Sequence, residues 1–371
     1  PVNWMDQIIK NFKLYYGRLQ TWYRKECGKS TGLFGIIFYR LPRILARKAY
    51  RQVAAIANER FVDRVYNHQR FKNFQTTHQQ RLGDHFYIIV MPNILHLLIP
   101  CLKLIPPQVN VFLILNGTAG WEENYLQKKF NGYPIFKLSV FPHSSLSHGS
   151  VLNLLLRSNE ANFGIIDHDL FIFKPQIFDE LNFSQDECVI GVFKLTNKKA
   201  QLRFPTTHFM FFNMKRIHHI MTTYKIDARQ YKKIPRHLED KLASIKIGNQ
   251  NYLKEYLDYF DTFNLILAMA FYENLSARIL ELSPEDLFHV GATSRGTNSI
   301  FSTYIHIKFL ELSESLSFRG KYANLLANFK DSKAVIEHIP GDLPALSFIS
   351  QINQIVSRLQ KTPAKHEASR G

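Results

Sequence analysis

Short apolar runs alternate with stretches of helical length through the middle of the chain. Such runs, bounded by turn residues, are typical of strands buried on both faces. They predict strands over residues 85–91, 110–115, 134–140 and 163–166. The stretches between them predict helices that end near Leu104, over 121–130 and over 149–157. This alternation predicts an α/β fold with a mixed, mostly parallel sheet flanked by helices.

The pattern continues less regularly towards the C-terminus. It predicts a strand over 208–213, a helix over 261–272, a strand over 277–282 and a polar loop over 289–295. Residues 1–80 and 301–360 have helix-like patterns, and residues 361–371 have the composition of a frayed end. The chain therefore divides into a basic helical N-terminal extension (1–83), an α/β domain (84–300) and a helical C-terminal extension (301–371).

Polar residues follow three of the predicted strands. Pro92-Asn93 follows the first, Asn116-Gly117 the second, and Asp167-His168-Asp169 the fourth. Because ligands of parallel sheets bind beyond the carboxyl ends of the strands, these residues mark the expected site.

Charge is distributed unevenly along the chain. The formal net charge is +17, of which residues 1–83 contribute +12. Together with the apolar run 33–39, this segment has the character of a membrane-surface element. The alternative is a helical extension that packs on the main domain with a solvated basic face. Three scattered cysteines and a polar N-terminus predict a cytoplasmic protein, with peripheral membrane contact if the first interpretation holds.

Two carboxylates separated by one residue at the end of a buried strand need a partner, because an isolated buried charge is costly. Asp167 and Asp169 are suited to a hard divalent cation that also binds diphosphate oxygens. The alternative is an ordinary turn or helix start. The strand-end position favours the metal site.

The order of motifs resembles the GT-A fold glycosyltransferases that use nucleotide sugars, most closely the large inverting family with an "ED" helix and a late histidine. The motifs are strand-Asn116-Gly117, Ser147-His148-Gly149 with Asn153, and strand-Asp167-His168-Asp169, within residues 84–300. The resemblance implies a hexosyltransferase that moves a sugar from a nucleotide diphosphate donor, UDP-sugar above all. The acceptor is a glycan, a lipid-linked or a protein acceptor, and no specific nucleic acid is expected.

The resemblance also implies roles for individual residues. Asp167, Asp169 and His289 would hold Mn²⁺ or Mg²⁺, and Asp167 would also contact the nucleotide. The other predicted donor-binding residues lie in three segments: Asn116 and Gly117; His148, Gly149 and Asn153; Ser294 and Arg295. At Asn116 the family has an acidic residue, so the nucleotide is left open.

Asp261 is the predicted catalytic base, at the start of a helix in the order of the family's "ED" helix. Phe260 replaces the first acid of that motif. Helix capping is the alternative role for Asp261. The literal Glu239-Asp240 pair occurs earlier, in a charged stretch. Whether the anomeric centre is inverted or retained stays open.

Two other classes of function remain. The first is a catalytically degenerate glycosyltransferase-like scaffold, suggested by the missing acid at Asn116 and the altered "ED" motif. The second is a basic nucleic-acid-binding protein, suggested by a pI near 9.6. Phosphotransferases and nucleases fit less well, because the chain has no P-loop motif and no dense acidic cluster.

Overall fold

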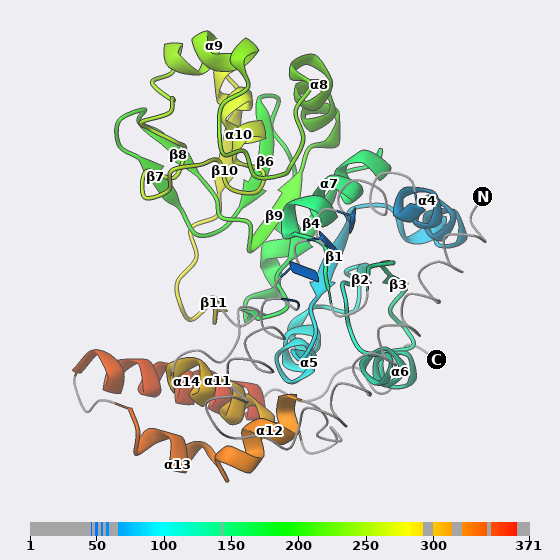
Figure 1. Cartoon of the computed structure of the whole chain (residues 1–371), viewed down its shortest axis with the longest axis vertical. Helices are drawn as coiled ribbons and strands as arrows, with labels where there is room; N and C mark the ends of the chain where they lie inside the picture. Colours follow the sequence, from blue (N-terminus) through cyan, green and yellow to red (C-terminus); the bar gives the residue numbers. More distant parts are fainter. Residues whose placement is uncertain are drawn as a thin grey trace.

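A computed structural model of the chain describes residues 66–141, 144–291, 300–313, 321–339 and 343–361, with single residues between 46 and 58. Its described part is built around a seven-stranded sheet in the order β10-β6-β9-β4-β1-β2-β3 (Figure 1). These strands are β1 (His85–Val90), β2 (Val111–Leu115), β3 (Ile135–Lys137), β4 (Phe163–Ile166), β6 (Glu187–Gly191), β9 (Phe209–Phe212) and β10 (Ser276–Ile279). Two small pairs accompany it: β5 (Leu170–Ile172) with β11 (Leu287–His289), and β7 (Leu195–Asn197) with β8 (Leu202–Phe204).

The helices alternate with these strands as the pattern predicts. Those before and within the sheet are α4 (His68–Thr77), α5 (Leu95–Leu104), α6 (Gly120–Lys129), α7 (His148–Ser158), α8 (Met214–Tyr224), α9 (Glu239–Ser244) and α10 (Asn264–Tyr272). Those after it are α11 (Ile300–Leu310), α12 (Lys321–Asn328), α13 (Ser332–Ile336) and α14 (Leu343–Lys361). Short 3-10 helices cover Gln79–Arg81, Pro175–Glu180 and Arg236–Leu238.

The predicted α/β class is confirmed. β1 pairs in parallel with β2 and β4, β2 with β3, and β6 with β10. The exception is β9, which lies antiparallel between β4 and β6. Strands β5, β6, β7, β8 and β11 are not predicted by the pattern, and β3 is shorter than predicted. Most of these are only three residues long, too short for a periodicity to identify.

Alternate residues of each strand enter different cores, since successive side chains point to opposite faces of a sheet. Tyr87 and Ile89 of β1 pack in the core that α4, α7, α8 and α10 cover. Phe86 and Ile88 pack on the other face, with α5 and the C-terminal helices. Both faces of β1 are therefore buried, which explains its uninterrupted apolar run.

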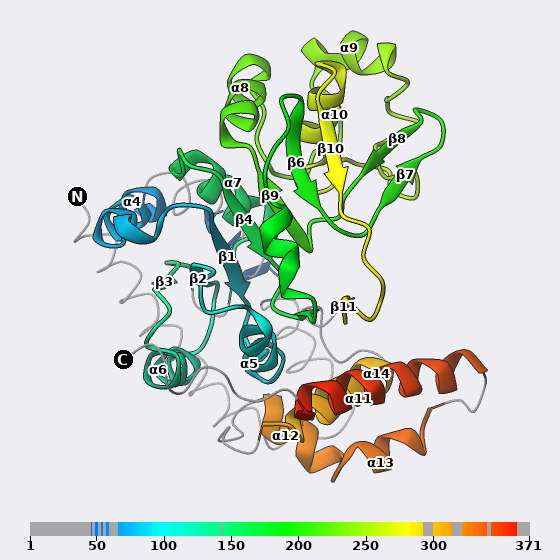
Figure 2. The ribbon, with the colours of Figure 1, turned by 180° about the vertical axis from the view of Figure 1, so that it is seen from behind.

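The C-terminal helices form one group beside α5 at one end of the molecule (Figures 1 and 2). α11 packs on α5, and His96 Nε2 lies 2.8 Å from His306 Nδ1 across that contact. Tyr322 of α12 accepts a hydrogen bond from the backbone N–H of Leu95, 3.0 Å away. These buried contacts join the helices to the α/β core.

None of the described helices is long and apolar enough to cross a membrane. The basic segment around residues 33–51 lies almost entirely outside the described residues, so its contact with a membrane surface stays a prediction. The division at residues 83 and 300 also stays a prediction. On the N-terminal side of the first boundary, Phe71 of α4 is fully buried in the same core as β1.

Candidate functional site

The two acids lie where β4 leaves the sheet. Asp167 follows Ile166, the last residue of β4, and a tight turn leads to β5, in which the Leu170 N–H donates to the Asp167 carbonyl at 3.1 Å. His168 between them is buried, with Nδ1 3.2 Å from the Ile89 carbonyl. The turn thus separates the middle side chain, which packs on β1, from the two carboxylates.

Strand pairing brings a histidine to Asp167. β4 and β9 are antiparallel with Ile166 opposite Phe209, so His208 comes opposite Asp167. The Asp167 N–H donates to the His208 carbonyl at 2.8 Å, which fixes this pairing in the backbone. The side chains then meet, with His208 Nδ1 2.9 Å from Asp167 Oδ2.

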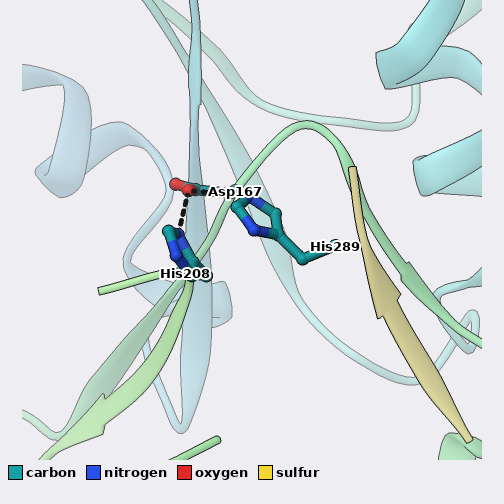
Figure 3. Close-up of side chains that lie close together, drawn as sticks. All are labelled: Asp167, His208 and His289. Atoms are coloured by element: carbon teal, nitrogen blue, oxygen red, sulfur yellow. Dashed lines mark hydrogen bonds and ion pairs between the residues drawn. The ribbon is translucent and has the colours of Figure 1, made fainter. Parts of the chain in front are cut away.

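A second histidine arrives from β11. This strand pairs antiparallel with β5, which places His289 opposite Leu170. Its Nε2 lies 3.2 Å from Asp169 Oδ1 and 3.6 Å from Asp167 Oδ2. The rings of His208 and His289 stack, with centroids 3.7 Å apart (Figure 3).

The electrostatics of His289 follow from these contacts. Burial by itself lowers the pKa of an imidazole, because it disfavours the charged form. The hydrogen bond to Asp169 and the charges of Asp169 and Asp167 outweigh burial and raise the pKa of His289. The ring thus occupies a strongly anionic environment.

Asp167, His208 and His289 each offer one ligand atom, and these atoms lie within 4.8 Å of one another. Figure 3 shows the three side chains close together; Asp167 follows β4, His208 precedes β9, and His289 ends β11. One carboxylate and two imidazoles form a donor set that divalent transition metals accept. Asp169 borders this group through its contact with the same His289 Nε2, and its own role as a metal ligand stays a prediction.

Comparison with known proteins finds a similarity in the segment that holds two of these three residues. Residues 62–217, which hold Asp167 and His208, match the family model described as the StrH glycosyltransferase N-terminal domain. Over these residues the chain resembles a glycosyltransferase. None of the curated proteins matches the chain.

Several solved glycosyltransferase structures are distantly similar to the chain. Glycosyltransferase GlyE of Streptococcus pneumoniae TIGR4 is 10% identical over 68% of this chain, with a TM-score of 0.37. The chain spans 64% of that structure, less than two thirds of its length. The galactosyltransferase LgtC, in complex with donor and acceptor sugar analogues, is 11% identical over 65% of this chain and 100% of its own, with a TM-score of 0.41. TarS 1–349 of S. aureus in complex with UDP is 14% identical over 74% of this chain and 82% of its own, with a TM-score of 0.31.

Asn116 and Gly117 follow the last residue of β2. The buried Asn116 side chain accepts from the Leu146 N–H at 2.8 Å and donates to the Leu146 carbonyl at 2.9 Å. Gly117 has φ +80°, and a Cβ there would lie 2.4 Å from the Ser144 carbonyl oxygen. The pair therefore fixes the loop before α7, and a nucleotide contact stays a prediction.

The start of α7 lies close to the acids. His148 is half-buried, and burial lowers its pKa, although the charges of Asp167 and Asp261 partly oppose this. A Cβ on Gly149 would lie 3.0 Å from the Arg229 Cα, so this glycine accommodates a neighbouring loop. Asn153 is buried within α7. Of the three predicted residues of this segment, His148 is the one whose charge interacts with the acids.

Asp261 precedes α10 and belongs to the same electrostatic neighbourhood, because its charge acts on His148. Its carboxylate accepts hydrogen bonds from Lys254 Nζ at 2.6 Å, Gln230 Nε2 at 2.9 Å and the Thr262 N–H at 2.8 Å. Burial raises its pKa, but Lys254 and the other donors outweigh burial and lower the pKa overall. Asp261 is therefore ionised at neutral pH.

Two of the predicted residues, Ser294 and Arg295, lie outside the described residues. One site residue, His208, was not predicted. It stands immediately before the predicted strand over 208–213, and only the antiparallel register of β9 with β4 brings it to Asp167. The sequence could have indicated His208 only if the strand over 208–213 had been expected to pair with the strand over 163–166, which ends at the acids.

Proposed function

We propose that the protein is a metal-dependent glycosyltransferase that transfers a hexose from a nucleotide diphosphate sugar, with UDP-sugar as the expected donor. The observation that carries this proposal is the Asp167, His208 and His289 cluster, two members of which lie in the segment similar to a glycosyltransferase domain. The acceptor is a glycan, lipid-linked or protein acceptor, and the proposed location is cytoplasmic, with peripheral membrane contact through the basic N-terminal segment.

The donor set supports Mn²⁺ more than Mg²⁺. Mg²⁺ binds mainly oxygen ligands, whereas imidazole nitrogens suit transition metals. With Asp167, His208 and His289 as its ligands, a divalent cation would stabilise the negative charge that builds on the departing diphosphate. Asp169, whose side chain is 4% exposed and whose Oδ1 lies 3.2 Å from His289 Nε2, would be a further oxygen ligand of that cation.

Residues around the cluster would position the substrates. His148 is half-buried beside Asp167 and Asp261, and its lowered pKa keeps the imidazole neutral, so it can accept or donate a hydrogen bond. Asp261 would accept the proton of the acceptor hydroxyl. For that role it must be ionised, which its lowered pKa ensures.

Calorimetric titration of the full chain with UDP tests the proposed function. Binding is expected in MnCl₂, weaker in MgCl₂, and at least about tenfold weaker in EDTA, because the cation links the carboxylate to the diphosphate. The second candidate, a catalytically degenerate scaffold, would keep the fold but would not show this dependence of UDP affinity on the metal. UDP affinity that is absent, or identical with and without metal, would contradict the proposal.

Asp261→Asn is expected to lower the rate of donor turnover by about 10²- to 10⁴-fold, the usual contribution of a general base. Asparagine keeps the shape and the hydrogen bonds to Gln230 and Thr262 but cannot take a proton. The measurement is the initial rate of UDP release from whichever of UDP-glucose, UDP-galactose and UDP-N-acetylglucosamine the wild type uses fastest.

Asp258→Asn is the matched control, because Asp258 is an exposed carboxylate of the same segment. Its rate should equal that of the wild type. Lys254→Met adds a pH readout: without the ammonium, burial dominates and the pKa of Asp261 rises, so the acid limb of the rate profile moves to higher pH. An Asp261→Asn enzyme with most of its rate would exclude Asp261 as the base.

A further inference from the structure

A pocket of about 420 Å³ lies beside the metal cluster and is used by none of the roles above. Its walls are residues 192–194, which follow β6, residues 279–283, which begin with the last residue of β10, and Leu287 of β11. β6, β10 and β4 are mutually parallel, so the pocket opens at the same carboxyl edge as Asp167. Figure 2 shows the chain leaving β10 at this edge on its way to β11.

Phe193 forms the wall between this pocket and the cluster. Its ring centroid lies 6.0 Å from that of His208 and 6.1 Å from that of His289, and 37% of the residue is exposed. Its φ is +57°, a left-handed conformation that bulky side chains rarely adopt. Neighbouring backbone hydrogen bonds, from Thr206 to the Val192 carbonyl and from Leu280 to the Gly191 carbonyl, hold it there.

Such strain persists where the surrounding structure imposes it, and it concentrates at binding and catalytic sites. More than a third of Phe193 is nevertheless exposed, at a position whose backbone conformation glycine would adopt without strain. The conformation does present an aromatic face next to the metal ligands.

The pocket combines apolar walls with two charged groups at its rim. Val192, Leu280 and Leu287 are buried at its base, while Lys194 and Glu281 are exposed. A volume of about 300–1,000 Å³ with mostly apolar walls and few polar groups is typical of small-molecule sites. A pyranose fits this chemistry: its C–H face packs on an aromatic ring, its hydroxyls accept from an ammonium and donate to a carboxylate.

The nucleotide fits it less well. From β1 the chain first adds β2 and β3 on one side and then β4 on the other, so the strand order reverses between β1 and β4. Ligands of such sheets bind at the reversal, which is on the β1–β3 side of the cluster. The pocket lies on the other side, beyond β9. The Glu281 carboxylate at its rim also repels a diphosphate. The pocket is therefore suited to the second substrate.

We propose that this pocket binds a pyranose ring of the acceptor, stacked on Phe193, so that the acceptor of this enzyme is a glycan. The inference rests on the proposed glycosyltransferase function and names its acceptor class. The ring belongs to a free glycan or to one carried on a lipid or protein, because the pocket recognises the sugar itself. Lys194 and Glu281 would bind its hydroxyls.

Saturation-transfer NMR with the methyl β-glycosides of glucose, galactose and N-acetylglucosamine tests this proposal. The wild type should bind at least one of them, and Phe193→Gly should weaken that binding at least tenfold. Glycine adopts positive φ without strain, which offsets part of the packing lost with the ring, so Phe193→Gly should still fold. Phe193→Tyr, which keeps the ring, should restore binding. Phe193→Asn, which also tolerates this conformation, serves if the glycine variant fails to fold.

Lys225→Gly is the matched control, since Lys225 has φ +53° at the exposed end of α8. This variant removes a similar backbone strain to that removed by Phe193→Gly, and it should bind the glycoside with the affinity of the wild type. No glycoside binding by the wild type, or equal binding by Phe193→Gly, overturns the proposal. Parallel titration of the wild type with UDP and Mn²⁺ separates the two conclusions: if glycosides bind but UDP does not, the proposed function fails and the sugar pocket stands.

Discussion

Asp167→Asn is expected to lower metal-dependent donor turnover about a thousandfold or more, since Lewis-acid stabilisation supplies several kcal/mol and each 1.4 kcal/mol is tenfold in rate. Asp167 contributes the carboxylate of the candidate metal site, and the same oxygen lies 2.9 Å from His208 and 3.6 Å from His289. The amide keeps the shape of the side chain but loses its charge. The measurements are the turnover rate and the affinity for Mn²⁺.

The remaining ligands can be ranked in the same experiment. His208 and Asp169 both lie at the candidate metal site, so His208→Ala and Asp169→Asn should each weaken Mn²⁺ binding at least about tenfold. Asp179→Asn is the control, because Asp179 is exposed after β5. Full activity of Asp167→Asn in EDTA would contradict the metal site.

Gly164→Ala is expected to destabilise the protein by about 3 kcal/mol or more, at the upper end of the cost of overpacking a core. A Cβ on Gly164 would lie 2.1 Å from Cε1 of Phe86 and 2.9 Å from the Met210 carbonyl oxygen. Phe86 cannot swing away, since Phe178, Phe209 and Phe211 surround its ring. Urea unfolding measures the loss. It is a large part of the roughly 5–15 kcal/mol that stabilises a typical protein.

Two variants check this cause. Gly120→Ala, at the start of α6, has no atom within 4 Å of the new Cβ and should leave stability unchanged or slightly raised. Phe86→Leu combined with Gly164→Ala should recover part of the loss, because it removes the ring atoms that clash. Equal stability of Gly164→Ala and the wild type would show that β4 and β1 separate easily, contrary to their buried pairing.

The strands in the middle of the sheet can be predicted from the sequence. The strands over 85–91, 110–115 and 163–166 are predicted within a residue or two, because both faces of β1, β2 and β4 are buried and leave continuous apolar runs. The outer strands β6 and β10 are harder to locate. Half-exposed residues in β10 and the acid Glu187 at the start of β6 interrupt their patterns.

Some residues of the candidate site can likewise be predicted from the local sequence, and others cannot. Asp167 and Asp169 are apparent locally, because charged residues at the end of a buried run need a partner. His289 is predicted only through the family resemblance. Asn116 looks like a ligand contact in the sequence, yet its side chain holds the Leu146 backbone. A residue at a strand end can serve the ligand or the loop, and the sequence alone does not distinguish them.

The sequence by itself determined the α/β architecture and the edge of the sheet at which the chemistry lies, because burial periodicity and turn residues are local properties. Only the tertiary structure decided which side chains meet at that edge. His208 is 41 residues from Asp167 along the chain, and His289 and Phe193 come from other strands again. Their proximity depends on the antiparallel entry of β9 and on the return of β11 to β5. Strand register is a collective result of packing, since a slip of one residue would turn these side chains to the opposite face.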